Sequence, residues 1–399
     1  MKNIIYRKID GKTHILNTST GSLISFDISE EERLDLFRNW KKLDLDEDSK
    51  NLFILKGQAN SRLCRNNLIE LGMEFGFPTT VNIEINRRCS LRCIHCYIGE
   101  KDLGSKDLSI FENKSLDELS TFLDDLLEMG VFLLVFTGGE PFLNKKLEKL
   151  IEMTSKKGFI VELFSNLQYI PPWFKDLEPN SSKIGRIQTS IYSSDEKVHD
   201  EITKTKGSFK KTIENLKYLL SKNFYVEVAT PLMSKNYNTW RETKDFFLKL
   251  GVKQDFSWPI VDLYYSRKVG KNLLNISADQ FKEFVDNNPD FIIKTDFSRG
   301  DDPICEAGKS LFSISSNGEI FPCSQLPHSV GNIKNDSIKS IYLSTGMKKF
   351  RNLKNSDTGI NEAYNYCMGT NYSETEDPLI QPKFFLDSIN KALENKPTN

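Results

Sequence analysis

"NRRCSLRCIHCYIGE", residues 86–100, gathers Cys89, Cys93 and Cys96 within eight residues of a chain that has seven cysteines in all. Three thiolates on one short loop can surround a compact inorganic core, whereas a structural zinc site needs four ligands. One coordination position would therefore stay open for another molecule. Two other interpretations are ordinary core cysteines and a zinc site completed by His95. The polar residues between the cysteines indicate instead an exposed loop.

The composition indicates the compartment and the classes of partner. The 399 residues carry a net charge of -1, with 38% hydrophobic and 27% charged residues, so no basic field points to nucleic acid or an anionic membrane. The start, "MKNIIYRKIDGKTHIL", lacks an apolar signal-peptide core, and no run of about 18 apolar residues occurs. We expect a cytoplasmic chain without nucleic-acid or membrane partners, whose clustered thiols bind metal rather than form disulfides. Cys64, which stands alone, should be an ordinary buried thiol.

Strands and helices alternate from Thr80 onward. Short apolar strands separated by amphipathic helices predict parallel β/α units with the helices outside. The predicted strands are 80–85, 131–137, 159–165, 184–192, 225–232 and 252–258, with helices that include 115–130, 144–158, 208–223 and 238–251. Six units are too few for a closed eight-stranded barrel, so we predict an α/β fold with a partial (β/α)6 TIM barrel. Its chemistry should lie at the carboxyl ends of the strands.

Three units are predicted along the chain. Residues 1–78 form a small N-terminal α+β domain, in which "YRKIDGKTHILNTSTGSLISFD" predicts a hairpin and residues 29–43 a helix with Ser29 as N-cap. Residues 79–280 form the partial barrel. Residues 281–399 form a C-terminal domain in which "SISSNGEIFPC" predicts a second hairpin. Its Asn-Gly turn should return Cys323 to the neighbourhood of Cys305.

"CSLRCIHCY", with Tyr97 after the third cysteine, resembles the signature loop of the radical S-adenosylmethionine (radical SAM) enzymes. The resemblance implies a 4Fe-4S cluster on Cys89, Cys93 and Cys96, with the fourth iron chelated by the amino and carboxylate groups of SAM. It further implies that the reduced cluster cleaves SAM and that the resulting 5'-deoxyadenosyl radical abstracts hydrogen from the substrate. Tyr97 would contact the cofactor, and a flavodoxin- or ferredoxin-type protein would supply the electron.

The ends of the next two strands are similar to cofactor-contacting segments of this family. Gly138, Gly139 and Glu140 in "FTGGEP" resemble the motif beside the SAM amino group. The glycines would let carbonyl groups approach the ammonium closely, and Glu140 would add an acceptor or order the loop. "LFSNLQ" then supplies Ser165 and Asn166 as SAM contacts, with leucine where the family often has glycine.

The fourth strand and its helix entry, "IQTSIYSSDEKVHDEITKTKGSF", also resemble the family. Gln188 and Ser190 are therefore candidates for contacts with the ribose hydroxyls. For His199 and Asp200 we prefer helix capping and surface polarity to a cofactor role.

Cys305, Cys323 and Cys367, with Gly318 between the first two, have a spacing that resembles the SPASM and twitch extensions of this superfamily. Two thiols across a hairpin and a third from a later loop can surround a second cluster. The other interpretation is a set of unrelated buried cysteines. The count of three implies one auxiliary iron–sulfur cluster of the twitch kind, because Thr370 stands where a fourth cysteine is often found.

The missing fourth ligand leaves three alternatives for this auxiliary site. The cluster is 4Fe-4S with an open iron, or 2Fe-2S with another ligand such as Asp377 or Tyr372, or it is absent from a degenerate domain. An open iron would bind a substrate thiolate or amine.

The resemblance also implies the class of substrate. The hairpin and helix of the N-terminal unit are similar to the peptide-recognition elements of peptide-modifying members, which bind a leader peptide by adding a strand to an exposed edge. An accessory cap on the barrel is the alternative. We expect a maturase of a ribosomally made peptide with a leader, which installs a thioether or other cross-link or epimerises a residue. The other hypotheses are a twitch-type dehydrogenase or sulfatase-maturation-like oxidase that needs no leader, and a non-catalytic iron–sulfur or zinc protein.

Overall fold

The structure is a computed structural model. It describes residues 4–9, 12–17, 22–26, 61–96, 98, 109–179, 184–260, 274–292, 294–296, 300–360 and 362–394. The predicted helix at 29–43, the side chain of Cys64 and Tyr97 lie outside this description.

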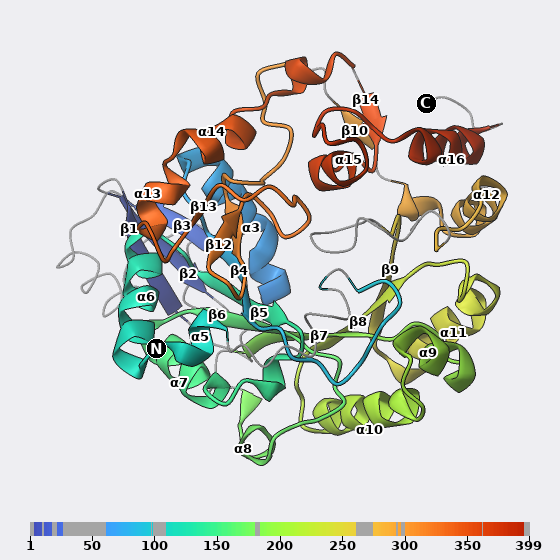
Figure 1. The fold of residues 1–399 in the computed structure, drawn as a ribbon, viewed down its shortest axis with the longest axis horizontal. Helices are drawn as coiled ribbons and strands as arrows, with labels where there is room; N and C mark the ends of the chain where they lie inside the picture. Colours follow the sequence, from blue (N-terminus) through green and yellow to red (C-terminus); the bar gives the residue numbers. More distant parts are fainter. Residues whose placement is uncertain are drawn as a thin grey trace, which may run out of the picture.

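A curved parallel sheet forms the centre of the molecule (Figure 1). Its strands follow one another in chain order, and each falls within or beside a predicted strand: β4 (Thr80–Asn86), β5 (Leu133–Gly138), β6 (Ile160–Phe164), β7 (Ile184–Ser190), β8 (Val226–Pro231) and β9 (Lys253–Ser257). On one face, alternate residues such as Val81, Ile83 and Ile85 enter the main hydrophobic core. The predicted six-strand partial barrel is confirmed.

Amphipathic helices line the outside of this sheet, as Figure 1 shows: α6 (Leu116–Glu128), α7 (Leu147–Lys157), α10 (Ser208–Ser221) and α11 (Trp240–Leu250). Helix α6 begins at a capping box, in which the Ser115 side chain accepts from Glu118 N and the Glu118 carboxylate accepts from Ser115 N. Helix α7 ends at Gly158, whose φ of 82° suits a residue without a Cβ. The four helices fall within the predicted ranges 115–130, 144–158, 208–223 and 238–251, so these predictions are confirmed.

The C-terminal segment extends the same sheet. Strand β11 (Leu311–Ile314) pairs parallel with β4 and antiparallel with β12 (Glu319–Phe321), and β13 (Gly331–Asn332) follows. Among the described residues the sheet therefore has nine strands, in the order β13-β12-β11-β4-β5-β6-β7-β8-β9. The hairpin at the Asn-Gly turn is confirmed. Its pairing with the first barrel strand was not predicted.

The remaining C-terminal elements complete the fold, and those between residues 338 and 347 add Ile338, Ile341, Tyr342 and Met347 to the main hydrophobic core. They are α12 (Ala278–Asn287), β10 (Lys294–Asp296), α13 (Ile338–Tyr342), α14 (Thr345–Arg351), β14 (Glu362–Tyr364), α15 (Met368–Thr375) and α16 (Lys383–Leu393). Helices α12 and α16 pack against each other near β9, where the Trp258 ring stacks on Phe281 at 4.1 Å and on Phe385 at 5.4 Å between ring centroids. This aromatic cluster attaches the end of the chain to the last barrel strand.

The N-terminal residues form a three-stranded antiparallel sheet of β1 (Ile4–Ile9), β2 (Lys12–Asn17) and β3 (Leu23–Phe26), followed by α3 (Ser61–Phe75). The predicted hairpin is β2 and β3. This sheet shares a hydrophobic cluster with the amino ends of β5 and β6. Buried Arg7 donates from Nε to Val131 O at 2.8 Å and from Nη2 to Gly158 O at 3.1 Å. The limits 1–78, 79–280 and 281–399 stay predictions, but the first unit is packed on the barrel.

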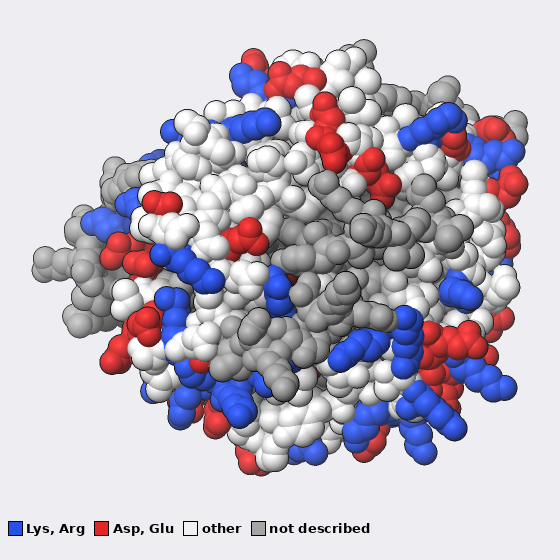
Figure 2. All heavy atoms as spheres, viewed as in Figure 1, with Lys and Arg blue, Asp and Glu red and all other residues white. Residues whose placement is uncertain are grey.

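Charged residues of both signs are interspersed over the face shown in Figure 2. None of the described helices is long and apolar enough to cross a membrane.

Candidate functional site: the cysteine loop and the auxiliary cysteines

The cysteine loop leaves the carboxyl end of β4 and is held from two sides by backbone hydrogen bonds. On one side, Gly139 N donates to Asn86 O at 2.9 Å and Glu140 N donates to Arg88 O at 2.7 Å. On the other side, Arg92 N and Ile94 N each donate at 3.0 Å to the last turn of α9 (Glu196–Thr203). The loop therefore takes its shape from β5 and α9, which lie far from it in the chain.

The two glycines of "FTGGEP" are needed by this contact. A Cβ on Gly138, whose φ is 123°, would lie 2.1 Å from Asn86 O, and a Cβ on Gly139 would lie 2.2 Å from Arg88 O. Real Cβ atoms essentially never come that close, so β5 could not approach the loop with any other residue. That carbonyl groups approach the SAM ammonium here stays a prediction. The close contact between β5 and the loop backbone is a second reason for glycine at these two positions.

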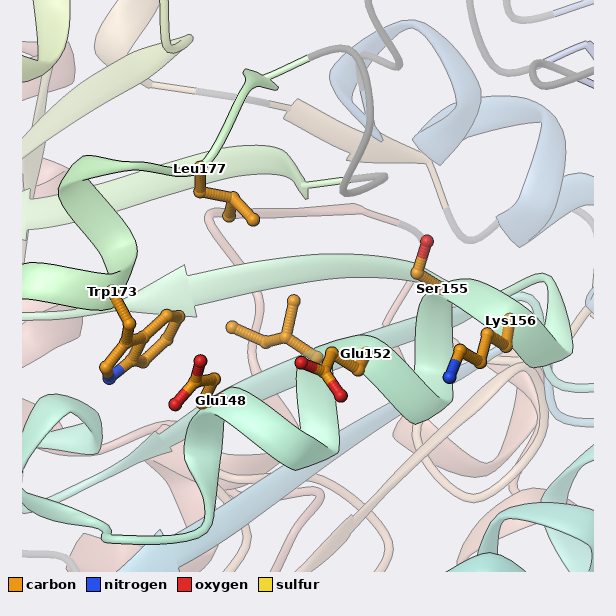
Figure 3. Close-up of a pocket in the computed structure, with 7 residues that line it drawn as sticks. Glu148, Glu152, Ser155, Lys156, Trp173 and Leu177 are labelled. Carbon is orange, nitrogen blue, oxygen red and sulfur yellow. The ribbon is translucent and has the colours of Figure 1, made fainter.

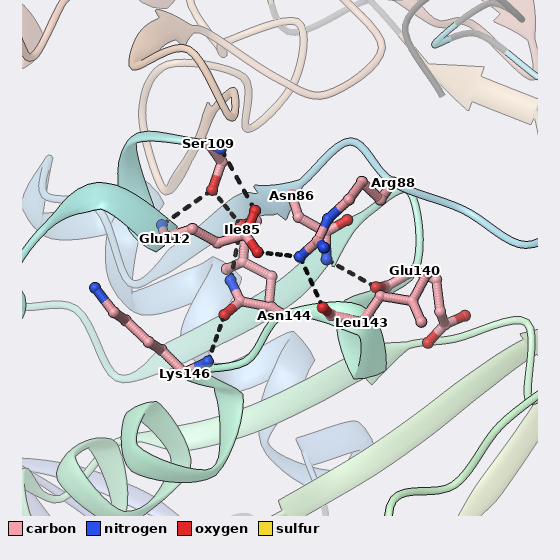
Figure 4. A network of polar contacts seen from close by, with 9 residues as sticks. All are labelled: Ile85, Asn86, Arg88, Ser109, Glu112, Glu140, Leu143, Asn144 and Lys146. Atoms are coloured by element: carbon pink, nitrogen blue, oxygen red, sulfur yellow. Dashed lines mark hydrogen bonds and ion pairs between the residues drawn. The ribbon is translucent and has the colours of Figure 1, made fainter. Parts of the chain in front are cut away.

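A network of polar contacts surrounds the start of the loop (Figure 4). Buried Asn86 donates from Nδ2 to Glu140 O at 2.8 Å. Arg88 forms an ion pair with Glu112 and also donates to Leu143 O at 2.9 Å. Asn144 donates from Nδ2 to Ile85 O at 2.9 Å, so the carbonyl group of the last residue but one of β4 is bonded from outside the sheet. These residues were missed in the sequence, where Asn or Arg next to a strand end has the appearance of an ordinary loop residue.

The structure brings three of the predicted SAM contacts together. Glu140 is only 1% exposed, and its carboxylate accepts from Ser165 Oγ at 2.8 Å, Asn166 N at 2.7 Å and Phe142 N at 3.1 Å. Burial raises the pKa of Glu140 to about 7 in spite of these bonds. Glu140 thus connects the ends of β5 and β6. Two roles were predicted for it, as an acceptor for the SAM ammonium or as a residue that orders the loop, and these hydrogen bonds support the second.

The three thiols lie half-buried, with hydrogen-bond donors aimed at two of them. Cys89 Sγ accepts from Leu91 N at 3.4 Å and from Asn166 Nδ2 at 3.3 Å. Cys93 Sγ accepts from the Tyr192 hydroxyl at 3.5 Å. Burial raises the pKa of Cys89 to about 11 and that of Cys93 to about 12. Three soft sulfur donors with hydrogen bonds to the sulfurs fit an iron–sulfur cluster, which such bonds commonly surround.

Gln188 and Ser190 lie on β7 in alternation with the buried Ile187 and Thr189, so they share a face of the sheet. Gln188 O accepts from Ser165 N at 2.9 Å, and the Ser190 side chain hydrogen-bonds to the Tyr192 hydroxyl. Ser190 is thus next to Tyr192, which contacts Cys93 of the loop, and Gln188 is next to Ser165 at the end of β6. Their contact with ribose stays a prediction.

His199 corrects one expectation. Its side chain is fully buried in α9, its Nδ1 accepts from Tyr192 N at 3.3 Å, and burial lowers its pKa to about 4. The prediction that His199 is a polar residue at the surface was therefore wrong. Capping was right for Asp200, whose carboxylate accepts from Ser208 Oγ at 2.8 Å and Phe209 N at 2.9 Å at the start of α10.

The auxiliary cysteines also lie near one another. Cys305 and Cys323 both pack against one hydrophobic cluster, and this burial raises the pKa of Cys305 to about 12 and raises that of Cys323 as well. Cys305 Sγ accepts from Ala307 N at 3.5 Å. Gln325 spans the other two thiols, because its N donates to Cys323 Sγ at 3.2 Å and its Oε1 accepts from Cys367 Sγ at 3.3 Å.

The two side chains predicted as substitute fourth ligands are bonded elsewhere. The Tyr372 hydroxyl shares a hydrogen bond of 2.9 Å with His328 Nδ1. Asp377 Oδ1 accepts from Leu379 N at 2.8 Å within its own turn. Thr370, which stands where a fourth cysteine is often found, is buried, with 7% of its surface exposed. The Gln325 side chain, in contrast, contacts the Cys367 thiol.

Contacts along β4 connect the two cysteine sets. Asn82 donates from Nδ2 to Ser324 Oγ, next to Cys323, at 3.5 Å. Arg87, two residues before Cys89, donates from Nε to Ser316 Oγ in the C-terminal hairpin at 2.8 Å. The hairpin that carries Cys323 is therefore packed against the strand that leads into the cysteine loop.

A separate hollow of about 310 Å³ lies between α7 and α8 (Pro172–Lys175) on the outside of the barrel (Figure 3). It is lined by Glu148, Ile151, Glu152, Ser155, Lys156, Trp173 and Leu177. None of the six cysteines whose side chains are described lines it, so it lies apart from the two cysteine sets.

Comparisons with known proteins agree with this geometry. The profile of the radical SAM superfamily matches residues 83–247, and that of the SPASM iron–sulfur cluster-binding domain matches residues 305–369. The chain is 28% identical over 301 residues to "Antilisterial bacteriocin subtilosin biosynthesis protein AlbA" of Bacillus subtilis (strain 168), which covers 72% of this chain but only 64% of AlbA. It is 22% identical over 346 residues to an "AdoMet-dependent heme synthase" of Methanosarcina barkeri (strain Fusaro / DSM 804), covering 77% of this chain and 96% of that protein.

The fold is also similar to that of Streptococcus suis SuiB, with a TM-score of 0.57 and 14% identity over 88% of this chain and 90% of SuiB. At that identity the likeness concerns the fold alone. The two matched domains confirm the predicted cofactor types, SAM with its iron–sulfur cluster and an auxiliary iron–sulfur cluster, while the assignment of each cysteine stays a prediction. The chain therefore carries a radical SAM domain at residues 83–247 and a SPASM iron–sulfur cluster-binding domain at residues 305–369.

Proposed function

We propose that this chain is a maturase that modifies a ribosomally made peptide and installs a thioether or other cross-link. The observation that carries the proposal is the auxiliary site. There Cys305 and Cys323 pack against one hydrophobic cluster and Gln325 contacts both Cys323 and Cys367, while the Asp377 and Tyr372 side chains are hydrogen-bonded elsewhere. A cluster on three thiols has one iron without a protein ligand, and iron–sulfur centres favour thiolates. A peptide cysteine is the thiolate that such a position would accept.

Cys89, Cys93 and Cys96 would hold the SAM-binding cluster. When bound, the cluster and SAM supply the hydrogen-abstracting radical that the family resemblance implies. The chain's own part is to keep the loop in place, through Gly138, Gly139 and the backbone bonds to α9. Gln188 and Ser190 remain candidates for the ribose contacts.

The N-terminal sheet would bind the leader. Strand β3 pairs with β2 on one side, so its other edge is an edge of the described sheet. Asn17 N donates to Ser22 O, so this pair is hydrogen-bonded across the ladder. Bonded and non-bonded pairs alternate, so Ser25, three residues further along and opposite His14, falls at a non-hydrogen-bonded position. The Ser25 N–H then points to the outer edge of the described sheet, where an added strand could pair with it.

The proposed leader edge and the cysteine loop lie at opposite ends of the barrel. The N-terminal sheet packs on residues at the amino ends of β5 and β6, whereas the loop follows the carboxyl end of β4. A strand of six residues such as β5 spans roughly 20 Å. The modified residue would therefore be separated from the bound leader segment by at least that length of extended peptide.

The relatives support two substrate classes. AlbA is described as a bacteriocin biosynthesis protein, and a solved SuiB structure contains a precursor peptide, which favours a peptide. The match to the heme synthase covers 96% of that protein, whereas the match to AlbA covers 64% of AlbA. This favours the second candidate function, a dehydrogenase-like oxidation of a small molecule. We further propose a cytoplasmic location, where thiols stay reduced, and a flavodoxin- or ferredoxin-type electron donor.

The test is co-expression with the peptide encoded by a short cysteine-containing reading frame beside the gene. A cross-link lowers the peptide mass by about two hydrogens, and blocking of the peptide cysteine identifies a thioether; unchanged mass with altered chirality indicates epimerisation instead. Ser25→Pro removes the edge N–H and should weaken peptide binding, whereas Ser25→Ala removes only the side-chain bond to His14 and should not. A peptide that is neither bound nor changed would refute the proposal in favour of the small-molecule class.

A further inference from the structure

Two side chains far apart in the sequence donate hydrogen bonds to the thiols of the first cysteine set. Asn166, after β6, donates from Nδ2 to Cys89 Sγ at 3.3 Å, and Tyr192, after β7, donates from its hydroxyl to Cys93 Sγ at 3.5 Å. Neither residue belongs to the cysteine loop. The two sulfurs therefore receive donors from the ends of two successive barrel strands.

The Tyr192 ring is held in place. It is 5% exposed and packs with Ile202, Met233 and Ile260. Its centroid lies 5.0 Å from that of His95 and 5.3 Å from that of His199, and its backbone N donates to His199 Nδ1. Because the ring is already fixed on several sides, the hydrogen bond from its hydroxyl to the sulfur costs little additional side-chain entropy.

The Asn166 amide is held as firmly. Its backbone N donates to Glu140 Oε2 at 2.7 Å, and its backbone O accepts from Thr212 Oγ1 at 2.9 Å. Its Oδ1 accepts from Gln168 N at 2.9 Å, which settles the orientation of the amide and leaves Nδ2 facing Cys89. Asn166 was predicted as a SAM contact, but these bonds give its side chain a different partner.

We propose that Asn166 and Tyr192 are positioning residues that raise the reduction potential of the cluster on Cys89, Cys93 and Cys96. Reduction adds one electron to a cluster held by thiolates, and the more negative state gains more from each hydrogen bond to sulfur. The site is half-buried, so the electrostatic effect of a fixed donor is less screened than in water. The proposal rests on the superfamily assignment and is independent of the peptide substrate.

Two variants remove one donor each. Tyr192→Phe keeps the ring and its packing and removes the hydroxyl. Asn166→Ser keeps a side-chain oxygen that can accept from Gln168 N but cannot reach Cys89. Tyr169→Phe is the matched control, because Tyr169 is 45% exposed and lies only three residues from Asn166.

The measurement is a redox titration of the anaerobically reconstituted proteins without SAM, followed by electron paramagnetic resonance after iron has been quantified. The auxiliary signal is removed by carrying all variants on a background with Cys305, Cys323 and Cys367 replaced by Ala. Each donor variant should weaken reduction about tenfold, a downward shift of about 59 mV for one electron. The double variant should shift further, and Tyr169→Phe should not shift.

Potentials equal to that of the unmodified background in both variants, with full iron content, would overturn the proposal. If Tyr192→Phe fails to fold or to take up iron, Asn166→Ser still decides. Loss of iron in both variants would also overturn it, because the donors would then be needed to assemble the site and not to set its potential.

Discussion

Replacing Gly139 by Ala tests the central structural claim about the cysteine loop. Gly139 does not have a left-handed φ, so alanine is allowed by its backbone and the effect arises from contact alone. The new Cβ would lie 2.2 Å from Arg88 O and 2.5 Å from Arg87 O. Both neighbours are main-chain atoms and cannot rotate away, so β5 or the loop must move.

The magnitude follows from the contacts that this movement breaks. Overpacking costs about 1–3 kcal/mol. The bonds from Gly139 N to Asn86 O and from Glu140 N to Arg88 O are lost with it, at about 1 kcal/mol each. We expect the free energy of unfolding to fall by about 3–5 kcal/mol, which is a large share of the roughly 5–15 kcal/mol of an ordinary domain.

Denaturant unfolding of the metal-free protein measures the stability, and iron analysis after anaerobic reconstitution measures the loop. Gly300→Ala is the control, because its nearest neighbour, the Ser356 Cβ, would lie at an ordinary 3.5 Å. Gly139→Ala should lose stability and bind less iron, while Gly300→Ala should do neither. Wild-type stability and iron content in Gly139→Ala would refute the reasoning. A variant that keeps the cluster but loses only SAM affinity would favour the ammonium contact as the reason for glycine.

Three further predictions concern other parts of the molecule. Burial lowers the pKa of His199 to about 4. Between pH 7 and pH 5 the unfolded chain therefore gains a proton that the folded chain does not gain. The free energy of unfolding should fall by about 2 kcal/mol over this range. Denaturation curves of His199→Phe at the two pH values should lack that loss, and an equal loss in both proteins would contradict the assignment. Arg7→Met should lower the free energy of unfolding by about 2–3 kcal/mol and make the N-terminal strands sensitive to proteolysis, because the bonds of Arg7 to Val131 O and Gly158 O are lost. Lys8→Met is the control, because Lys8 is exposed. Equal proteolysis of the two variants would contradict the role of Arg7 in attaching these strands to the barrel. Replacing all three auxiliary cysteines by Ala should remove about half of the reconstituted iron, and unchanged iron would exclude a cluster on Cys305, Cys323 and Cys367.

The alternation of apolar strands and amphipathic helices was sufficient to predict the barrel. Each unit is local: a strand such as Ile160–Phe164 and a helix such as Leu147–Lys157 follow from the periodicity of a few residues and from caps such as Gly158. The cysteine loop was equally local, since its three thiols lie on one turn. The Asn-Gly hairpin belongs to the same class of signals.

Several features of the site depended on residues that meet only after folding. The pairing of β11 with β4 joins segments about 230 residues apart, and no pattern in either strand names the other as its neighbour. Arg7 has the appearance of a surface residue in an alternating strand, yet it is buried against the barrel. His199 was expected at the surface for the same reason, because a single polar residue carries no sign of the elements that cover it.

The sequence by itself determined the superfamily, the partial barrel and the two sets of cysteines, because these follow from short-range spacing. Only the tertiary structure decided what holds the loop in place. It placed Gly138 and Gly139 against the loop backbone, turned Glu140 toward Ser165 and Asn166, and aimed donors at the thiols of Cys89 and Cys93. Those contacts come from strand ends that neighbour one another in space and not in the chain, and distances across a curved sheet are set by the packing of the whole barrel.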